Sequence, residues 1–162
     1  MNGTPSRYIE ILLDAQRLTL WDRGHALLEA SVSTARNGPG DRRDSECTPR
    51  GWHEICAKVG AGAPPGTVFV GRRPTGERYS PGLRAAGPGR DWILTRILWL
   101  SGLEPGVNRD GDVDSRERYI YIHGAPDDVP MGRPGSRGCG RMCNVEVIRL
   151  FDLVEEGAPS VI

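Results

Sequence analysis

Apolar and polar residues alternate with a period of two near the start of the chain. In the stretch "YIEILLDAQRLTLWD" the alternating apolar residues are Ile9, Ile11, Leu13, Leu18 and Leu20. Successive side chains of a β-strand point to opposite faces, so this spacing predicts two short strands with a turn over residues 14–16. The stretch "ALLEASVST" that follows predicts a third strand.

The middle of the chain divides into strands and polar loops. Residues 35–46, "ARNGPGDRRDSE", are polar and contain Gly and Pro, which indicates an exposed loop. Strands are predicted for "GWHEICAKVG", "GTVFVGRR" and "RYIYIHG", the last ending at Gly124. Residues 71–90 repeat Gly and Pro and indicate a long surface excursion. The largely apolar "DWILTRILWL" fits either a short helix or a buried strand.

A helical pattern appears near the C-terminus, in "NVEVIRLFDLVEEG". The apolar residues spaced for one helix face are Val147, Ile148, Phe151 and Val154. Asn144 is a suitable N-cap and Gly157 a suitable stop, and "APSVI" predicts a closing strand. The whole pattern predicts one mostly β domain over residues 1–162, with one clear helix directly after Cys139.

The composition argues against several classes of partner. Lys and Arg number 21 and Asp and Glu number 21, so the net charge is zero and no electrostatic footprint for nucleic acid or an anionic membrane is visible. No apolar run approaches the roughly 18 residues of a membrane span. The N-terminus "MNGTPSRYIEILLDAQ" lacks the basic and apolar regions of a signal peptide. We therefore expect a cytoplasmic protein, or a periplasmic one if the N-terminus was trimmed, and predict no protein partner.

The cysteines and the glycine-rich segments predict neither a metal site nor a cofactor. The cysteines are Cys47, Cys56, Cys139 and Cys143, with C-x8-C and C-x3-C spacings where zinc sites use C-x2-C. The stretch "NRDGDVDSRE" lacks the glycine and the final Glu of a calcium loop at the required positions, and predicts a turn at residues 110–111. No Walker-type loop, dinucleotide fingerprint or G-x-S-x-G elbow occurs, which argues against nucleotide binding and serine hydrolase chemistry.

The candidate chemistry lies in "YIYIHGAPDDVPMGRPGSRGCGRM". Cys139 stands between two glycines and close to Arg137 and Arg141, so its sulfur is expected to be accessible and electropositive. His123 ends a predicted strand, and a nearby imidazolium lowers the pKa of a thiol. The backbone N–H groups of Gly138 and Cys139 can face a developing oxyanion. Each residue taken alone is structural more often than not, but the pair favours a cysteine acyltransferase or hydrolase.

A resemblance to a known family is carried by "HGAPDDVPMGRPGSRGCGRM". This stretch resembles the signature of the L,D-transpeptidase catalytic-domain family (YkuD-like), in which His-Gly is followed after a short loop by Ser-x-Gly-Cys-x-Arg. The likeness extends to "YIEILLDAQRLTLWD", "CTPRGWHEI" and the terminal "VEEGAPSVI", and so covers essentially the whole chain. It implies a β-sandwich or mixed-sheet fold with the helix following the nucleophile. Two positions differ: Arg137 stands where members often have His, and Gly140 where they prefer a branched apolar residue.

The resemblance implies acyl transfer on a peptidoglycan stem peptide or soluble muropeptide. The reaction cleaves the L,D bond between the third residue, a diamino acid, and the terminal D-Ala of a tetrapeptide. The resemblance assigns Cys139 as nucleophile, His123 as base and later acid, and the Gly124 carbonyl as the group that orients the imidazole. The oxyanion and substrate site implied is Ser136, Arg137, Gly138 and Arg141, with no metal or organic cofactor.

The acceptor that resolves the acyl-enzyme is left open. Since no export signal is seen, we expect soluble muropeptides as substrate and water as a frequent acceptor, which gives L,D-carboxypeptidase activity in cell-wall recycling. One alternative is a cross-linking L,D-transpeptidase. Another is a degenerate domain that binds muropeptide or a partner without turnover, and Gly140 favours that alternative.

Overall fold

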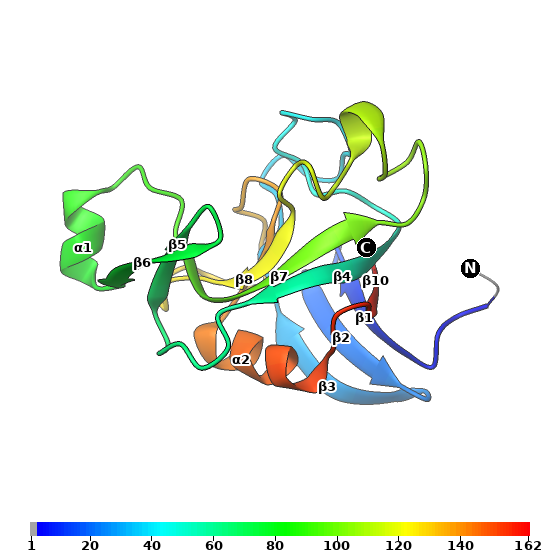
Figure 1. Ribbon diagram of the computed structural model, residues 1–162, viewed down its shortest axis with the longest axis horizontal. Coiled ribbons are helices and arrows are strands. Elements are labelled where there is room, and N and C mark those ends of the chain that lie inside the picture. Colours follow the sequence, from blue (N-terminus) through cyan, green and yellow to red (C-terminus); the bar gives the residue numbers. More distant parts are fainter. Residues whose placement is uncertain (1–2) are drawn as a thin grey trace.

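The computed structural model describes residues 3–162, and in that range it contains one mixed β-sheet and two α-helices (Figure 1). The strands are β1 (Arg7–Leu12), β2 (Arg17–Asp22), β3 (His25–Ser31), β4 (Trp52–Val59), β5 (Thr67–Val70), β6 (Arg73–Arg78), β7 (Ile93–Gly102), β8 (Tyr121–Gly124), β9 (Gly140–Met142) and β10 (Pro159–Val161). The helices are α1 (Pro81–Ala86) and α2 (Asn144–Leu153), with a 3-10 turn at Gly111–Val113. The predicted mostly β fold with a clear helix after Cys139 is confirmed.

The N-terminal strands pair as the sequence predicts and then join the C-terminus. Strands β1, β2 and β3 pair antiparallel in chain order, while β1 also pairs in parallel with β10, placing Ile9 opposite Ser160. Strand β10 pairs in turn with β4, so the first and last strands both lie inside the sheet. Two residues after β3, Ser33 forms a bridge with Arg141 of β9. Because β9 pairs with β8 and β8 with β7, this bridge closes the sheet on itself.

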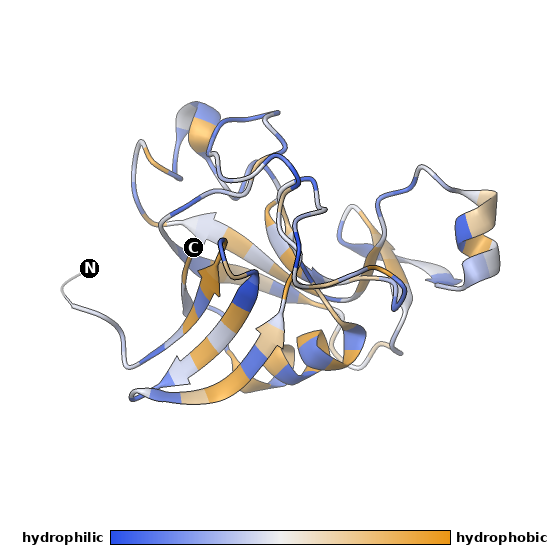
Figure 2. Ribbon diagram, turned by 180° about the vertical axis from the view of Figure 1, so that it is seen from behind, coloured by the Kyte–Doolittle hydropathy of each residue, from blue (hydrophilic) through white to orange (hydrophobic). Residues whose placement is uncertain are grey.

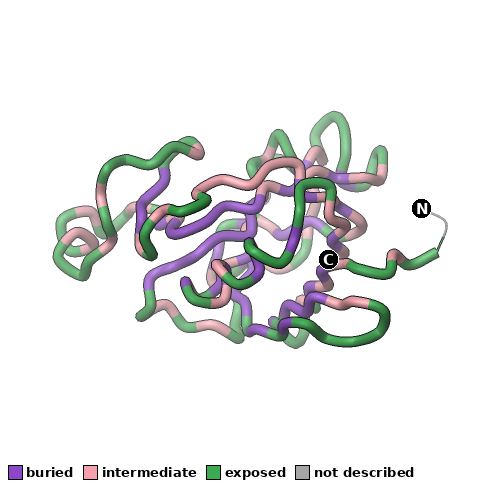
Figure 3. The backbone as a smooth tube through the Cα atoms, turned by 60° about the horizontal axis from the view of Figure 1, so that its bottom comes forward, coloured by how far each residue is buried: buried purple, intermediate pink, exposed green. Residues whose placement is uncertain are grey.

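The main core lies between the sheet and α2. Figure 2 shows hydrophobic and hydrophilic residues alternating along the strands, and Figure 3 shows the central strands buried beneath exposed loops. From α2 the core receives Val147, Leu150, Phe151 and the following Val154. The sequence predicted Ile148 on the buried face of the helix, but Ile148 is only half-buried and Leu150 is fully buried instead. The reason is that residues of one helix face follow i, i+3, i+4, i+7 spacing, whereas residues at i and i+1 point in different directions.

Both predicted ends of α2 are wrong. The N-cap is Cys143, and Asn144 is the first helical residue with its side chain turned into the protein. The helix ends before Val154, which is already extended, and Gly157 takes φ +88° in the turn that leads to β10. The side chain of Asn144 is used elsewhere, as described below. Within residues 3–162, neither α-helix is long and apolar enough to cross a membrane.

The predicted excursion over residues 71–90 contains regular structure instead of a continuous loop. Strand β6 pairs with β5, and α1 follows, with the Ser80 hydroxyl accepting the Leu83 N–H at 3.0 Å as its cap. Leu83 packs against a small separate cluster that includes Trp92, which anchors this projecting arm to the sheet (Figure 1). The ambiguous stretch "DWILTRILWL" is strand β7, which pairs with β4, β5 and β8.

Candidate active site

A cavity of about 490 Å³ opens beside the strand pair β8–β9 and brings together most of the predicted site residues. The predicted residues that line it are His123, Ser136, Arg137, Cys139 and Arg141. The parallel pairing of β8 and β9, with Ile122 opposite Gly140, carries His123 and Cys139 to the same place. Gly124 and Gly138 do not line the cavity, and they act through the backbone behind it.

His123 is buried and held in one tautomer. Its Nδ1 lies 2.6 Å from the carbonyl oxygen of Gly124. A carbonyl can only accept, so Nδ1 carries the proton and Nε2 carries the lone pair. Burial lowers the pKa of His123 below its ordinary 6.5 and outweighs the hydrogen bond to Gly124, which raises it. At neutral pH the imidazole is therefore uncharged, with a free base at Nε2.

Gly124 is backed by side-chain and backbone atoms that leave no room for a Cβ. A methyl group there would stand 2.5 Å from Oδ1 of Asn144 and 2.6 Å from the carbonyl of Leu94. Asn144 accepts a 2.5 Å hydrogen bond from the Thr95 hydroxyl and donates to Asp127 at 3.1 Å. Thr95 takes φ +74°, which costs a β-branched residue energy and marks a site fixed by its surroundings. The residue predicted as a helix cap thus supports the strand that carries the histidine.

The thiol of Cys139 lies between two backbone groups. Its Sγ accepts the N–H of Tyr121 at 3.3 Å and donates to the carbonyl of Tyr119 at 3.5 Å. The residue is half-buried and packs against the apolar cluster of Phe69, Ile97 and Tyr121. Burial raises the pKa of the Cys139 thiol to about 12, more than offsetting the N–H of Tyr121 and the nearby arginines. The expectation of a lowered thiol pKa is therefore wrong, and the resting pair is a neutral thiol and a neutral imidazole.

The loop before the cysteine is fixed by two hydroxyl groups. The Ser136 hydroxyl accepts the Gly138 N–H at 3.2 Å and donates to the Cys139 carbonyl at 2.5 Å. The Thr48 hydroxyl donates to the Gly138 carbonyl at 2.9 Å and accepts the N–H of Ala35. Gly138 adopts φ +131°, a conformation that favours glycine. Its N–H is thus already engaged, whereas within residues 3–162 the Cys139 N–H makes no hydrogen bond and stays available to an oxyanion.

Several cavity residues were not predicted as site residues from the sequence, among them Arg118 and Asp91. Arg118 is half-buried and donates to the carbonyls of Asp41 at 3.2 Å and Cys47 at 2.7 Å, which ties loop 35–46 and the residues just after it to the cavity wall. Asp91 pairs with Arg141 at 3.4 Å. Neither residue belongs to a recognisable motif, and both reach the cavity only through long-range packing.

Arg72 stands at the tip of the β5–β6 hairpin. Its guanidinium donates to the Tyr121 hydroxyl at 3.0 Å and lies 4.4 Å from the ring centroid of Trp99 and 5.0 Å from that of Tyr119. Stacking on aromatic rings holds an arginine in place while leaving its charge uncompensated.

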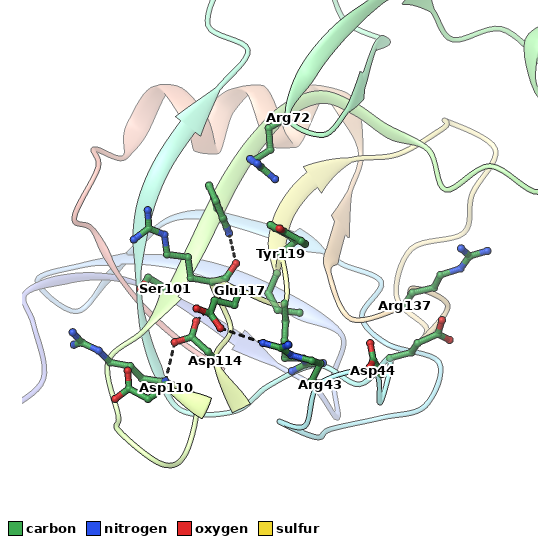
Figure 4. A pocket seen from close by; sticks show the side chains of 15 residues that line it. Arg43, Asp44, Arg72, Ser101, Asp110, Asp114, Glu117, Tyr119 and Arg137 are labelled. Carbon is green, nitrogen blue, oxygen red and sulfur yellow. Dashed lines mark hydrogen bonds and ion pairs between the residues drawn. The ribbon is translucent and has the colours of Figure 1, made fainter. Parts of the chain in front are cut away.

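A larger cavity of about 940 Å³ adjoins the first (Figure 4). The two share Arg72, Arg118, Tyr119 and Arg137 among their lining residues. The larger cavity is lined by both arginines and carboxylates. Among them, Arg43 pairs with Glu117 at 3.2 Å (Figure 4). The residues that line the larger cavity are mostly exposed, so the smaller cavity is open to solvent on the side where the two cavities adjoin.

The fold and the arrangement of His123, Cys139 and the Gly124 carbonyl can be compared with those of known protein families. The family model described as "L,D-transpeptidase catalytic domain" (YkuD) matches residues 6–162, and the chain belongs to this family. The family consists of acyl-transfer enzymes that act on peptidoglycan stem peptides. The resemblance read from the sequence is thereby confirmed. No curated protein sequence matches the chain.

Solved structures with the same fold are L,D-transpeptidases. The catalytic domain of the Enterococcus faecium enzyme, acylated by ertapenem, matches with a TM-score of 0.58 and 17% identity, covering 99% of each chain. The C442S mutant of the E. faecium enzyme matches with a TM-score of 0.58 and 17% identity over 97% of this chain and 49% of that one. An enzyme from Mycobacterium smegmatis gives 0.55 and 18% over 96% and 58%. The chain thus spans about half the length of several of these relatives.

Proposed function

We propose that the protein catalyses acyl transfer on peptidoglycan tetrapeptide stems through a thioester on Cys139. The observation that supports this most directly is the Nδ1–H tautomer of His123, fixed by Gly124, with Nε2 left to act as a base in the cavity that Cys139 also lines. Because the thiol is neutral at rest, the proton must leave sulfur as the new bond forms, and this step requires a base.

The chemical steps balance without a cofactor. Sγ of Cys139 attacks the carbonyl carbon of the third stem residue while His123 takes the thiol proton. The C–N bond to the terminal D-Ala then breaks, and His123 returns the proton to the departing amine. Of the two N–H groups suggested by the sequence, we assign the oxyanion to that of Cys139, which is unengaged within residues 3–162, because that of Gly138 is bonded to the Ser136 hydroxyl.

The acceptor that releases the thioester is the finer part of the proposal. The adjoining cavity offers room for a second stem, and carboxylates such as Asp44 and Asp110 in its lining suit an incoming ammonium group. This arrangement supports an amine acceptor and hence transpeptidation. Hydrolysis is the second candidate, because the same cavity opens the thioester to water and would give an L,D-carboxypeptidase that trims muropeptides.

Mass spectrometry of a disaccharide-tetrapeptide incubated with the protein tests both. Exchange of the terminal D-Ala for an added D-amino acid, or formation of a dimer, indicates transfer. Loss of one alanine without exchange indicates hydrolysis. The Cys139→Ser variant should do neither, while Cys143→Ser, which changes an exposed cysteine outside the cavity, should retain activity.

The raised pKa of Cys139 favours one competing assignment, a domain that binds muropeptide without turnover. Acylation by a carbapenem separates the two. The E. faecium catalytic domain is acylated by ertapenem, and we expect a stoichiometric ertapenem adduct on Cys139 of this chain. Intact-protein mass spectrometry should show the added mass in the wild type and in Cys143→Ser but not in Cys139→Ser. An unmodified wild type would favour the non-catalytic assignment.

A further inference from the structure

The cavity around Cys139 concentrates positive charge in a chain whose net charge is zero. Its lining includes Arg72, Arg118, Arg137 and Arg141, with Asp91 as the acidic residue of the same lining. The neighbouring larger cavity also contains arginines, but there carboxylates offset them. Arg72, Arg118 and Arg137 line both cavities, and on the side of the thiol Asp91 is the one acidic residue of the described lining.

These arginines are held mainly by neutral groups. Arg118 donates to backbone carbonyls, and Arg72 donates to the Tyr121 hydroxyl and stacks on aromatic rings. Arg141 is the one cavity arginine that pairs with an acid within residues 3–162, at 3.4 Å from Asp91. Arg137 is exposed and forms neither a hydrogen bond nor an ion pair in the described part of the chain. A carbonyl or an aromatic face leaves the charge of a guanidinium uncompensated, so the cavity attracts an anion.

The charge does not serve to ionise the nucleophile. Burial keeps the pKa of the Cys139 thiol at about 12 in spite of the arginines. A second use of the charge is to recognise the peptide. A carboxylate accepts paired hydrogen bonds from a guanidinium, whereas a carboxamide carries no charge and presents its own N–H donors to the arginine.

We propose that this cavity selects donor stems that carry a free side-branch carboxylate, with Arg137 as the residue that reads it, and that it discriminates against stems in which this group is amidated. The inference rests on the proposed function and names its substrate class. Two stem positions can supply the carboxylate: the acidic second residue and the second carboxyl group of a third-position diamino acid. Arg137 lines both cavities, and its guanidinium is unpaired among the described residues, so it can contact a carboxylate from either stem position.

The test compares one tetrapeptide in three forms: both side-branch carboxylates free, the second residue amidated, or the third residue amidated. We expect kcat/KM to be about tenfold or more higher for the free acid than for the form amidated at the recognised position. The other amide should behave like the free acid, which identifies the source of the carboxylate. Raising the salt concentration should narrow the difference.

Arg137→Gln should lower kcat/KM on the free acid by about tenfold while leaving the amidated peptide nearly unchanged, so that the preference falls to within about threefold. Arg133→Gln is the matched control, because Arg133 is an exposed arginine of the same loop outside the cavity lining, and its preference should equal that of the wild type. A circular dichroism spectrum of each variant verifies that it is folded.

The outcomes separate this inference from the proposed function. Equal turnover of all three peptides overturns the selectivity while upholding acyl transfer. If no peptide is turned over, the proposed function fails, and calorimetric binding to Cys139→Ser decides the selectivity alone. The inference is supported if Cys139→Ser binds the free acid at least tenfold more tightly than the amidated peptide and if the double variant Cys139→Ser/Arg137→Gln loses this difference. Equal binding or no binding of the three peptides overturns it.

Discussion

Asn144 and Thr95 share a 2.5 Å hydrogen bond directly behind Gly124. The amide oxygen of Asn144 fills the space in which a side chain on Gly124 would stand, and the Gly124 carbonyl in turn fixes the imidazole of His123. A helix that begins at Asn144 and a strand that carries Thr95 thereby determine where the base points. Asn144 is a positioning residue, since it acts through Gly124 and is not among the described residues that line the cavity.

Replacing Asn144 by Ala should therefore weaken both stability and catalysis. The change leaves the buried Thr95 hydroxyl without its acceptor, which costs about 1–3 kcal/mol in the free energy of unfolding. The loosened imidazole should lower kcat and shift the acid limb of its pH profile, an effect that a general loss of stability does not produce. Urea denaturation and a kcat–pH profile measure the two effects. Val145→Ala, at an exposed neighbouring position, should change neither.

The pH dependence of acylation follows from the buried histidine. Only neutral His123 can take the thiol proton, and burial holds its pKa below 6.5. The rate of ertapenem acylation should therefore stay level as the pH falls from 8 to 6.5 and decline only at lower pH. Stopped-flow rates across this range provide the measurement. A decline already centred above 6.5 would mean that the working base is not this imidazole.

The reactivity of the thiol toward a simple alkylating agent should show the opposite trend. The thiolate is the species that reacts, and with a thiol pKa of about 12 it is scarce at neutral pH. Modification of Cys139 by iodoacetamide should accelerate by about tenfold per pH unit between pH 7 and pH 10. Peptide mapping of the alkylated protein follows the site without interference from the other cysteines. A rate that levels off near neutral pH would indicate a thiolate stabilised beyond what the burial of Cys139 allows.

Two neighbouring glycines should respond in opposite ways to the same substitution. Gly140 lies in β9 without a positive φ, and an added Cβ would meet Ile11 and Ile122 at an ordinary 3.9 Å. Gly140→Ala should therefore raise the free energy of unfolding by about 0.4–1 kcal/mol, because it restricts the unfolded chain. Gly138→Ala should lower it by more than that, since φ is +131° and the Cβ would press to 3.1 Å on the Cys47 carbonyl. Urea denaturation of both variants gives the comparison.

The period-two strands could be predicted because alternation is a local signal. Residues such as Ile9 and Ile11 face the core while their neighbours face outward, and that pattern is visible in the sequence. Strand β7 was ambiguous because Leu94 to Leu98 are buried on both faces, which removes the alternation. The arm at residues 71–90 was missed because its cap at Ser80 and its packing involve few apolar residues.

The site was predicted only as far as its motif reaches. The signature named His123 and Cys139, but their shared cavity depends on the β8–β9 pairing, which no local pattern specifies. The thiol environment was misjudged because adjacent arginines are visible in the sequence, whereas the apolar cluster around Phe69 is assembled from distant strands. Arg118 was missed for the same reason.

A second buried histidine should make the stability of the fold depend on pH. His53 is fully buried in β4; its Nδ1–H donates to the Gly51 carbonyl at 3.0 Å, and Nε2 accepts the Ser115 hydroxyl at 2.8 Å. Burial lowers its pKa below 6.5, so below that pH the unfolded chain binds a proton that the folded protein excludes. Stability should thus be complete above pH 6.5 and fall as the pH drops toward the lowered pKa, by up to about 1.4 kcal/mol per pH unit for this group.

Urea denaturation from pH 5 to pH 8 measures the slope, to which the buried His123 adds. His53→Gln should reduce the slope by one proton's worth, and His25→Gln, at the exposed start of β3, should leave it unchanged. An unchanged slope in His53→Gln would mean that His53 is protonated in the folded protein, with Nε2–H donating to the Ser115 hydroxyl, and would overturn the prediction.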